Sequence, residues 1–168
     1  MLIQQKIGNI ATTEIADRMV DYLSLEWFET QKRIMHKRSR MGIEVAIKFL
    51  CGGQNLTQGD ILFMDDSTVI AIEILPCEVI VIRPKNMFEM ASVCYEIGNK
   101  HLPLFYDSED VLVVFDAPLF RLLNASGYEV KQENRKLINP LNTSVSAHEH
   151  SGGGETLFSK IMKLTKPQ

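Results

Sequence analysis

The sequence predicts an α+β protein with an N-terminal all-β domain, a second domain in which strands and helices alternate, and a flexible C-terminal tail. Three observations support this division. Residues 1–75 hold many short apolar runs separated by turn residues, residues 76–138 hold two helix-length patterns between strands, and residues 139–168 become polar and lose the pattern. The boundary between the domains is expected at Leu75-Pro76-Cys77, because the proline ends a strand.

The first domain is predicted to be a small β-sandwich or barrel. Its strands are expected at residues 2–10, 20–28, 43–47, 61–64 and 69–75. Turns at 40–42 and 65–67 separate the later strands. As neighbours in an extended segment, Trp27 and Phe28 should face opposite sides. One of them then belongs to the core, and the other faces either a second buried surface or an interaction partner.

The hairpin segment 31–40 is strongly basic. Its cationic residues are Lys32, Arg33, Lys37, Arg38 and Arg40. Runs of charge are mostly solvated surfaces, so the outer face of a hairpin explains this run adequately. A docking surface for an acidic protein partner is the alternative, and the sequence leaves both interpretations open.

The second domain has more regular spacing. The expected elements are a strand at 78–83, a helix at 87–98, strands at 102–106 and 111–115, a helix at 116–123 and a strand at 128–137. This order is βαββαβ, the split ferredoxin-like motif. Asp116 is suited to cap the start of the second helix, and Gly127 should stop the chain from continuing as helix.

Composition argues against several classes of protein. The chain has 168 residues and a net charge of -3, whereas a protein that binds duplex nucleic acid would usually carry a basic excess. No apolar run approaches the ~18 residues that a membrane helix needs. No P-loop, GxSxG or HExxH motif indicates an enzyme. The three cysteines form no CxxC pair and no disulfide framework, so we expect a reduced, cytoplasmic protein without nucleic-acid or membrane partners.

The first helix is expected to end just before a histidine. One face of this helix should carry Met87, Met90, Cys94 and Ile97. Gly98 and Asn99 tolerate the left-handed conformation that often ends a helix, and Pro103 prevents the helix from resuming. His101 should therefore be displayed just beyond the helix end. From position alone it is either an inert surface residue or an accessible ligand.

Other side chains offer alternative ligands. Cys94 lies seven residues before His101 on the same helical face, although a cysteine in an apolar helix is usually a small core residue. His36, in the basic hairpin, is expected to be solvated. In the tail, His148 and His150 are separated by one residue, and this pair either chelates an ion or has no role. Residues 155–166 have one broad apolar stripe and should order only by docking on another surface.

The segment around His101 resembles a known signature. Glu96-Ile-Gly-Asn-Lys-His-Leu-Pro-Leu104 is similar to the metal-binding signature of the urease accessory nickel metallochaperones. The segments Leu25-Glu-Trp-Phe-Glu-Thr30 and Leu56-Thr-Gln-Gly-Asp-Ile-Leu-Phe63 also resemble that family. The resemblance implies a β domain followed by a ferredoxin-like metal domain, with His101 as the central nickel ligand. It also implies a homodimer, or a dimer of dimers, that works with the urease accessory GTPase and the urease apoprotein assembly complex.

One histidine in each chain is enough for such a site if two chains meet on a twofold axis, because symmetry brings the same residue together from both copies. We expect His101 from two subunits to form an open two-imidazole platform, with His148 or His150 as further ligands. Imidazole ligands suit nickel, and zinc or copper can occupy the same site. Metal binding requires the neutral ring, so acidification below about pH 6 should release the ion.

The predicted function is therefore a nickel-binding metallochaperone that delivers Ni(II) for urease assembly and is not an enzyme. Two departures from the family limit this expectation. The tail has only two histidines, which argues against nickel storage, and residues 111–116 lack the histidine pair that some members carry there. The alternative is a ferredoxin-like protein- or RNA-binding module without a metal role, because this fold supports many functions.

Overall fold

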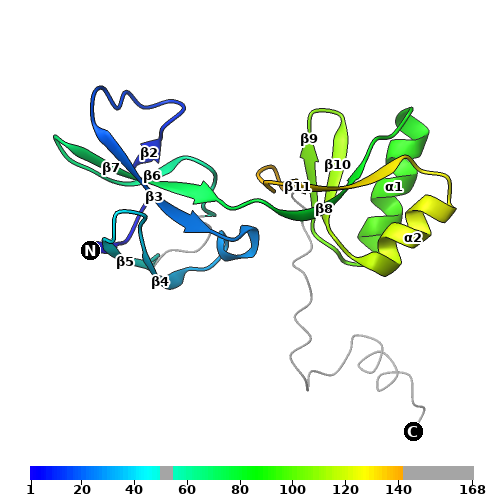
Figure 1. The fold of residues 1–168 in the computed structure, drawn as a ribbon, viewed down its shortest axis with the longest axis horizontal. Helices are drawn as coiled ribbons and strands as arrows, with labels where there is room; N and C mark the ends of the chain where they lie inside the picture. Colours follow the sequence, from blue (N-terminus) through cyan, green and yellow to red (C-terminus); the bar gives the residue numbers. More distant parts are fainter. Residues whose placement is uncertain (50–54, 142–168) are drawn as a thin grey trace, which may run out of the picture.

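A computed structural model describes residues 1–49 and 55–141 of the 168-residue chain. These residues form two lobes side by side, joined where β7 runs into β8 (Figure 1). Both helices lie in the C-terminal lobe, on the side of its sheet that faces away from the N-terminal lobe. The chain is thus α+β with an all-β N-terminal part, as the sequence predicts.

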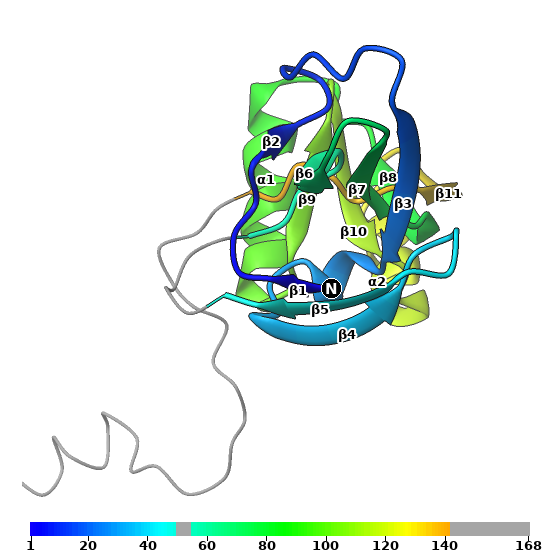
Figure 2. The ribbon, with the colours of Figure 1, turned by 90° about the vertical axis from the view of Figure 1, so that its left-hand side faces the viewer.

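The N-terminal lobe consists of two sheets. One has the order β1 (Leu2–Ile3), β5 (Glu44–Lys48) and β4 (Ile34–Arg38), and the other β2 (Gly8–Asn9), β6 (Asp60–Met64), β7 (Thr68–Ile74) and β3 (Met19–Leu25). Figure 2 looks onto this lobe and shows the first sheet lying across from the second. Alternating apolar side chains from both sheets, such as Val45 and Ile47 from β5 and Leu23 from β3, form one shared buried core.

Two segments of this lobe differ from expectation. Residues 2–10 form two short strands instead of one, because the polar stretch at 4–6 carries the chain from the first sheet to the second. Lys6 anchors this crossing by an ion pair of 2.9 Å from its Nζ to Asp60 Oδ2. The expected strand at 20–28 ends at Leu25, and Trp27–Glu29 form a 3-10 helix, η1. Trp27 and Phe28 therefore do not alternate as strand residues would.

The C-terminal lobe has the predicted βαββαβ order. Its elements are β8 (Cys77–Ile82), α1 (Met87–Asn99), β9 (Leu104–Asp107), β10 (Asp110–Val114), α2 (Ala117–Ala125) and β11 (Val130–Arg135). The sheet is antiparallel, in the order β11-β8-β10-β9. As predicted, Asp116 caps α2 by accepting a hydrogen bond of 2.8 Å from the Leu119 backbone N–H, and Gly127 follows with a φ of 84°.

The two faces of this sheet bury different residues. The face under the helices packs side chains such as Ile80, Val113 and Ile97 into one core cluster. The opposite face buries a second apolar cluster of Val79, Val81, Phe105, Leu112 and Leu137, against which Trp27 of the N-terminal lobe also packs. We call this second cluster the outer-face cluster.

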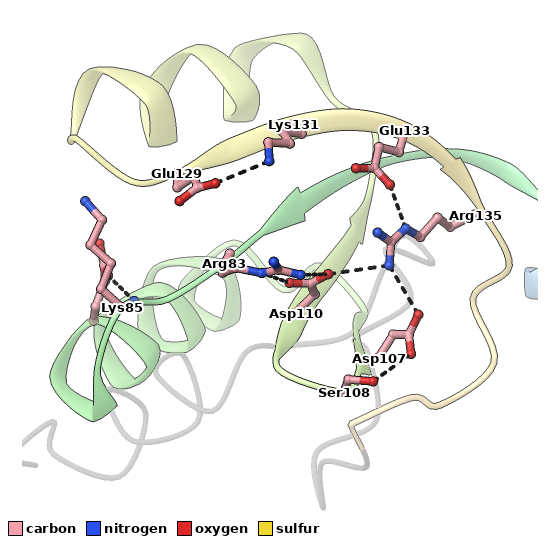
Figure 3. A network of polar contacts seen from close by, with 10 residues as sticks. Arg83, Lys85, Asp107, Ser108, Asp110, Glu129, Lys131, Glu133 and Arg135 are labelled. Atoms are coloured by element: carbon pink, nitrogen blue, oxygen red, sulfur yellow. Dashed lines mark hydrogen bonds and ion pairs between the residues drawn. The ribbon is translucent and has the colours of Figure 1, made fainter.

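A network of ion pairs joins Arg83, just after β8, to Asp110 of β10 and Arg135 of β11 (Figure 3). At its centre is Asp110, which is 4% exposed. Arg83 donates two hydrogen bonds to its carboxylate, of 2.7 Å and 3.1 Å, and Arg135 donates a longer one of 3.4 Å. Among the described residues, no helix is long and apolar enough to cross a membrane.

Candidate metal centre

Helix α1 is fixed firmly at its start and along its inner face. Asn86 caps the helix by accepting a hydrogen bond of 2.9 Å from the Glu89 N–H. Val93 and Ile97 are fully buried against the sheet. These contacts determine where the helix ends and in which direction the following residues leave it.

His101 adopts the left-handed conformation directly after that end. Its φ is 55°, one of three positive φ values among the non-glycine residues that the structure describes, and its N–H donates to the Gly98 carbonyl at 2.9 Å. The expectation that Gly98 or Asn99 would be left-handed is wrong, because α1 continues through Asn99 and Lys100 is still right-handed. The helix therefore ends in the usual left-handed way, but with histidine at the position where glycine is most common.

This placement costs stability. A left-handed conformation is unfavourable by about 1–2 kcal/mol for a residue with a Cβ, and glycine would avoid most of that cost. The His101 side chain is exposed, so its packing does not offset the strain. A strained, exposed residue that the fold does not need is an indication of function.

The outer side of α1 carries large apolar side chains in solvent. Met87, Phe88 and Tyr95 are 84%, 82% and 70% exposed. Met87 was expected on one helical face with Met90, Cys94 and Ile97, but only those three pack against the helix-side core. We call Met87, Phe88, Tyr95 and Gly98 the α1 stripe. Such exposed apolar surface on a folded protein often marks an interface.

Gly98 is notable within the α1 stripe. Its φ is not positive, and an added Cβ would meet no atom of the described residues within 4 Å. Glycine inside a helix is less favourable than alanine by about 1 kcal/mol, and the described residues show no contact that requires a glycine here. A close approach by another surface, three residues before His101, would give this glycine a purpose.

Cys94 is poorly suited to be a ligand. It is half-buried against the helix-side core, and its Sγ lies 3.9 Å from Met90 Sδ. Burial raises the pKa of the Cys94 thiol, which disfavours the thiolate that binds metals. The geometry therefore supports a core role for this residue.

The remaining histidines are placed differently. His36 is exposed on β4 in the N-terminal lobe, on a different sheet from any element near His101. His148 and His150 lie outside the described residues, as does the amphipathic segment 155–166. Within residues 1–49 and 55–141, no three His, Cys, Asp or Glu side chains are grouped to hold a metal ion.

The start of the tail runs beside the strand that follows His101. Leu141 donates a backbone hydrogen bond of 2.8 Å to Leu104, and Tyr106 donates one of 3.0 Å to Asn139. Phe105 and Pro140 form an antiparallel bridge between these two bonds. This pairing cannot be predicted from the sequence, because residues 138–141 have no strand pattern and are held by a long-range contact.

The two-lobed fold, with the signature segment at the end of α1, has the layout that the resemblance implied: a β part followed by a βαββαβ part. Family profiles agree with this. The profile described as the N-terminal domain of the UreE urease accessory protein matches residues 3–75, and the corresponding C-terminal domain profile matches residues 77–157. The chain belongs to the UreE family of urease accessory proteins.

Individual relatives cover nearly the whole chain. A urease accessory protein UreE from Flavobacterium johnsoniae is 46% identical over 166 residues, covering 99% of this chain and 100% of the relative. The UreE of Actinobacillus pleuropneumoniae is 42% identical over 153 residues, covering 89% and 81%. That of Helicobacter pylori is 38% identical over 149 residues, covering 87% and 88%.

Proposed function

We propose that this protein is a nickel metallochaperone that carries Ni(II) as cargo for assembly of the urease active site. His101 from two copies of the chain holds the ion, and His148 or His150 adds ligands from the tail. The observation that carries the proposal is the exposed, left-handed His101 at the end of the α1 stripe. The urease accessory name of its relatives supplies the biological process.

The α1 stripe supports a twofold dimer through this helix. A second copy packed on the stripe would bury Phe88 and Tyr95, and it would come close to the backbone at Gly98. Symmetry would then place His101 of each copy near the same axis. A dimer of dimers is the larger alternative.

The path of the chain supports the tail ligands. Leu141 is bonded to Leu104, three residues beyond His101, and His148 follows seven residues later. Seven extended residues span at most about 25 Å, so both tail histidines can return to the α1 end. A site completed by a tail can also open, which suits a protein that must release its metal.

Each of the three parts of the chain has its own role in this proposal. Residues 76–138 form the metal-binding domain, residues 1–75 form a domain that docks protein partners, and residues 139–168 form the tail. The partners are the urease accessory GTPase and the urease apoprotein complex. The protein itself is no enzyme, so the GTPase supplies the energy for insertion. Zinc or copper can occupy the same histidines.

The rival function, a ferredoxin-like module that binds RNA or protein, gains no support from this fold. RNA-binding domains of this fold stack bases on the exposed face of the sheet. Here that face buries the outer-face cluster, including Phe105 and Leu112, and Trp27 packs onto it.

Nickel calorimetry on three chains tests the proposal: wild type, His101→Ala and His101→Gly. Both variants should lose the tight site, whereas His36→Ala, the control, should bind as wild type does. His101→Gly should also be more stable than His101→Ala by about 1 kcal/mol, because glycine relieves the left-handed strain. Loss of binding only when His148 and His150 are both replaced would move the site to the tail and refute the role of His101.

A further inference from the structure

Trp27 connects the two lobes. It packs against the core of the N-terminal lobe and also against the outer-face cluster of the C-terminal sheet. Its ring meets that of Phe105 edge-on, with 5.7 Å between the ring centroids and an interplanar angle of 82°. Phe105 lies in β9, four residues after His101.

The turn that carries Trp27 is fastened to the N-terminal lobe. Glu26 and Glu29 form a reciprocal capping box around η1, and Lys37 of β4 binds Glu29 at 2.5 Å. Thr30 Oγ1 donates to the Trp27 carbonyl at 2.7 Å. These contacts attach the turn, and with it Trp27, to the N-terminal lobe.

The segment 136–141 contacts both lobes at this junction before it leads into the tail. Lys136 forms an ion pair of 3.5 Å with Glu73 of β7, which Arg40 also binds. Leu137 belongs to the outer-face cluster under Trp27, and residues 139–141 line the edge of β9. One short segment therefore bonds to the N-terminal lobe and to the strand that follows His101, and it also carries the tail histidines.

Among the described residues, the contacts between the lobes centre on the side chain of Trp27 and on one partly exposed ion pair, next to the chain connection at Leu75-Pro76. Interfaces between domains of one chain usually permit relative motion. The junction can therefore be latched, as described here, or released. In the latched arrangement residues 139–141 pair with β9, which begins three residues after His101.

We propose that Trp27 and the segment 136–141 form a latch that couples the orientation of the N-terminal lobe to metal loading at His101. The coupling rests on the proposed function, because it needs an ion held by His101. It passes through β9, which follows His101 and contacts both Trp27 and the segment 136–141. An ion bound this way favours the latched arrangement, and by reciprocity a weakened latch lowers the affinity for the ion. A partner that docks on the N-terminal lobe and releases the latch would thereby promote metal release.

Fluorescence of the full-length chain tests this directly, because Trp27 is its sole tryptophan. Titration of the wild type with nickel chloride should shift the emission maximum to shorter wavelength as Trp27 becomes more fully covered. The wavelength is used because a bound nickel ion can change the intensity by quenching alone. His101→Ala should keep the metal-free spectrum of the wild type and show no shift.

Two lysines provide a matched pair of variants. Lys136→Gln removes the ion pair to Glu73 in the N-terminal lobe. Lys131→Gln, in β11, removes an ion pair to Glu129 that lies wholly within the C-terminal lobe. Lys136→Gln should emit at longer wavelength without metal and bind nickel about 5-fold or more weakly. Lys131→Gln should match the wild type in both. Phe105→Leu, which keeps an apolar core residue, should behave like Lys136→Gln.

The outcomes separate the two proposals. If nickel binds and is lost in His101→Ala, but the emission maximum does not move and Lys136→Gln binds as tightly as Lys131→Gln, the latch is refuted and the metallochaperone function stands. If the wild type binds no nickel, the proposed function fails and the latch fails with it.

Discussion

The N-terminal lobe pairs much of its basic run with carboxylates of the same lobe, whereas the most exposed large apolar side chains of the described residues lie on α1 in the C-terminal lobe. In the N-terminal lobe the basic run is largely neutralised within the fold, since Lys37 pairs with Glu29, Arg38 with Glu44 and Arg40 with Glu73. In the C-terminal lobe the α1 stripe stays exposed and His101 stays strained. The difference directs attention to the α1 stripe and His101 as the features of the C-terminal lobe that a single folded copy does not explain.

Each lobe also contains a carboxylate that several hydrogen bonds hold in place, and the two carboxylates differ in the strength of those bonds. Asp110 receives two hydrogen bonds from one guanidinium and a third from Arg135, whereas Glu29 is held by lysines and by its own turn. Two parallel bonds from one arginine are stronger and better oriented than the single bonds of an ammonium group. The C-terminal network is thus expected to be the more important of the two for stability.

The largest predicted effect on folding follows from Asp110. Asp110→Ala should lower the free energy of unfolding by about 2–3 kcal/mol, because it removes charged hydrogen bonds made by a buried carboxylate. Urea unfolding measures this change. Asp107→Ala, at an exposed carboxylate that binds the same Arg135, is the control and should cost much less. Equal losses in the two variants would contradict the central place given to Asp110.

The next effect concerns the α1 stripe. Phe88→Asp should weaken self-association about 100-fold, because a buried aromatic residue would be replaced by a charge in the interface. Sedimentation over a range of concentrations measures this. Phe28→Asp changes a residue of the same type, 53% exposed in the N-terminal lobe, and should leave the association constant unchanged. If both variants associate like the wild type, the α1 stripe is not the interface.

The smallest effect tests the neutralised charges of the N-terminal lobe. Burial alone raises the pKa of Glu29, but hydrogen bonds from Lys37 and the Glu26 backbone, with the charge of Lys37, outweigh it and lower the pKa below its ordinary value of 4.5. A lowered carboxyl pKa stabilises the fold above about pH 4.5, and this stabilisation is lost as the pH falls through the lower folded value.

Comparison with Glu29→Gln measures that contribution. The variant should be less stable than the wild type by about 1 kcal/mol at pH 7, and the two should converge on acidification below about pH 4.5. Thermal unfolding across this range provides the measurement. A constant difference between the two chains at every pH would show that the charge of Glu29 contributes nothing.

The sequence predicted the elements whose signals are local. The βαββαβ order, the cap at Asp116 and the stop at Gly127 depend on spacing and on single residues, and the structure confirms them. The split of residues 2–10 between two sheets depends on contacts with β5 and β6, which no local pattern shows. The turn at Trp27 did have a local signal, because Glu26 and Glu29 have the spacing of a capping box.

The site itself was predictable only in part. Position and glycine spacing placed His101 beyond a helix end, but only the resemblance distinguished a ligand from an inert surface residue. Its left-handed backbone was missed because Gly98 and Asn99 are better suited to that conformation, and burial of Ile97 carries α1 past both of them. The place where the tail begins, beside Leu104, is a long-range contact and left no trace in the sequence.

The most direct test is native mass spectrometry of the wild-type chain loaded with a limiting amount of nickel. A twofold cradle around His101 predicts a single dominant species of two chains and one ion, with metal-free dimer as the remainder. Single chains that each carry their own ion would contradict the shared site, because they would show that one copy already supplies a complete set of ligands.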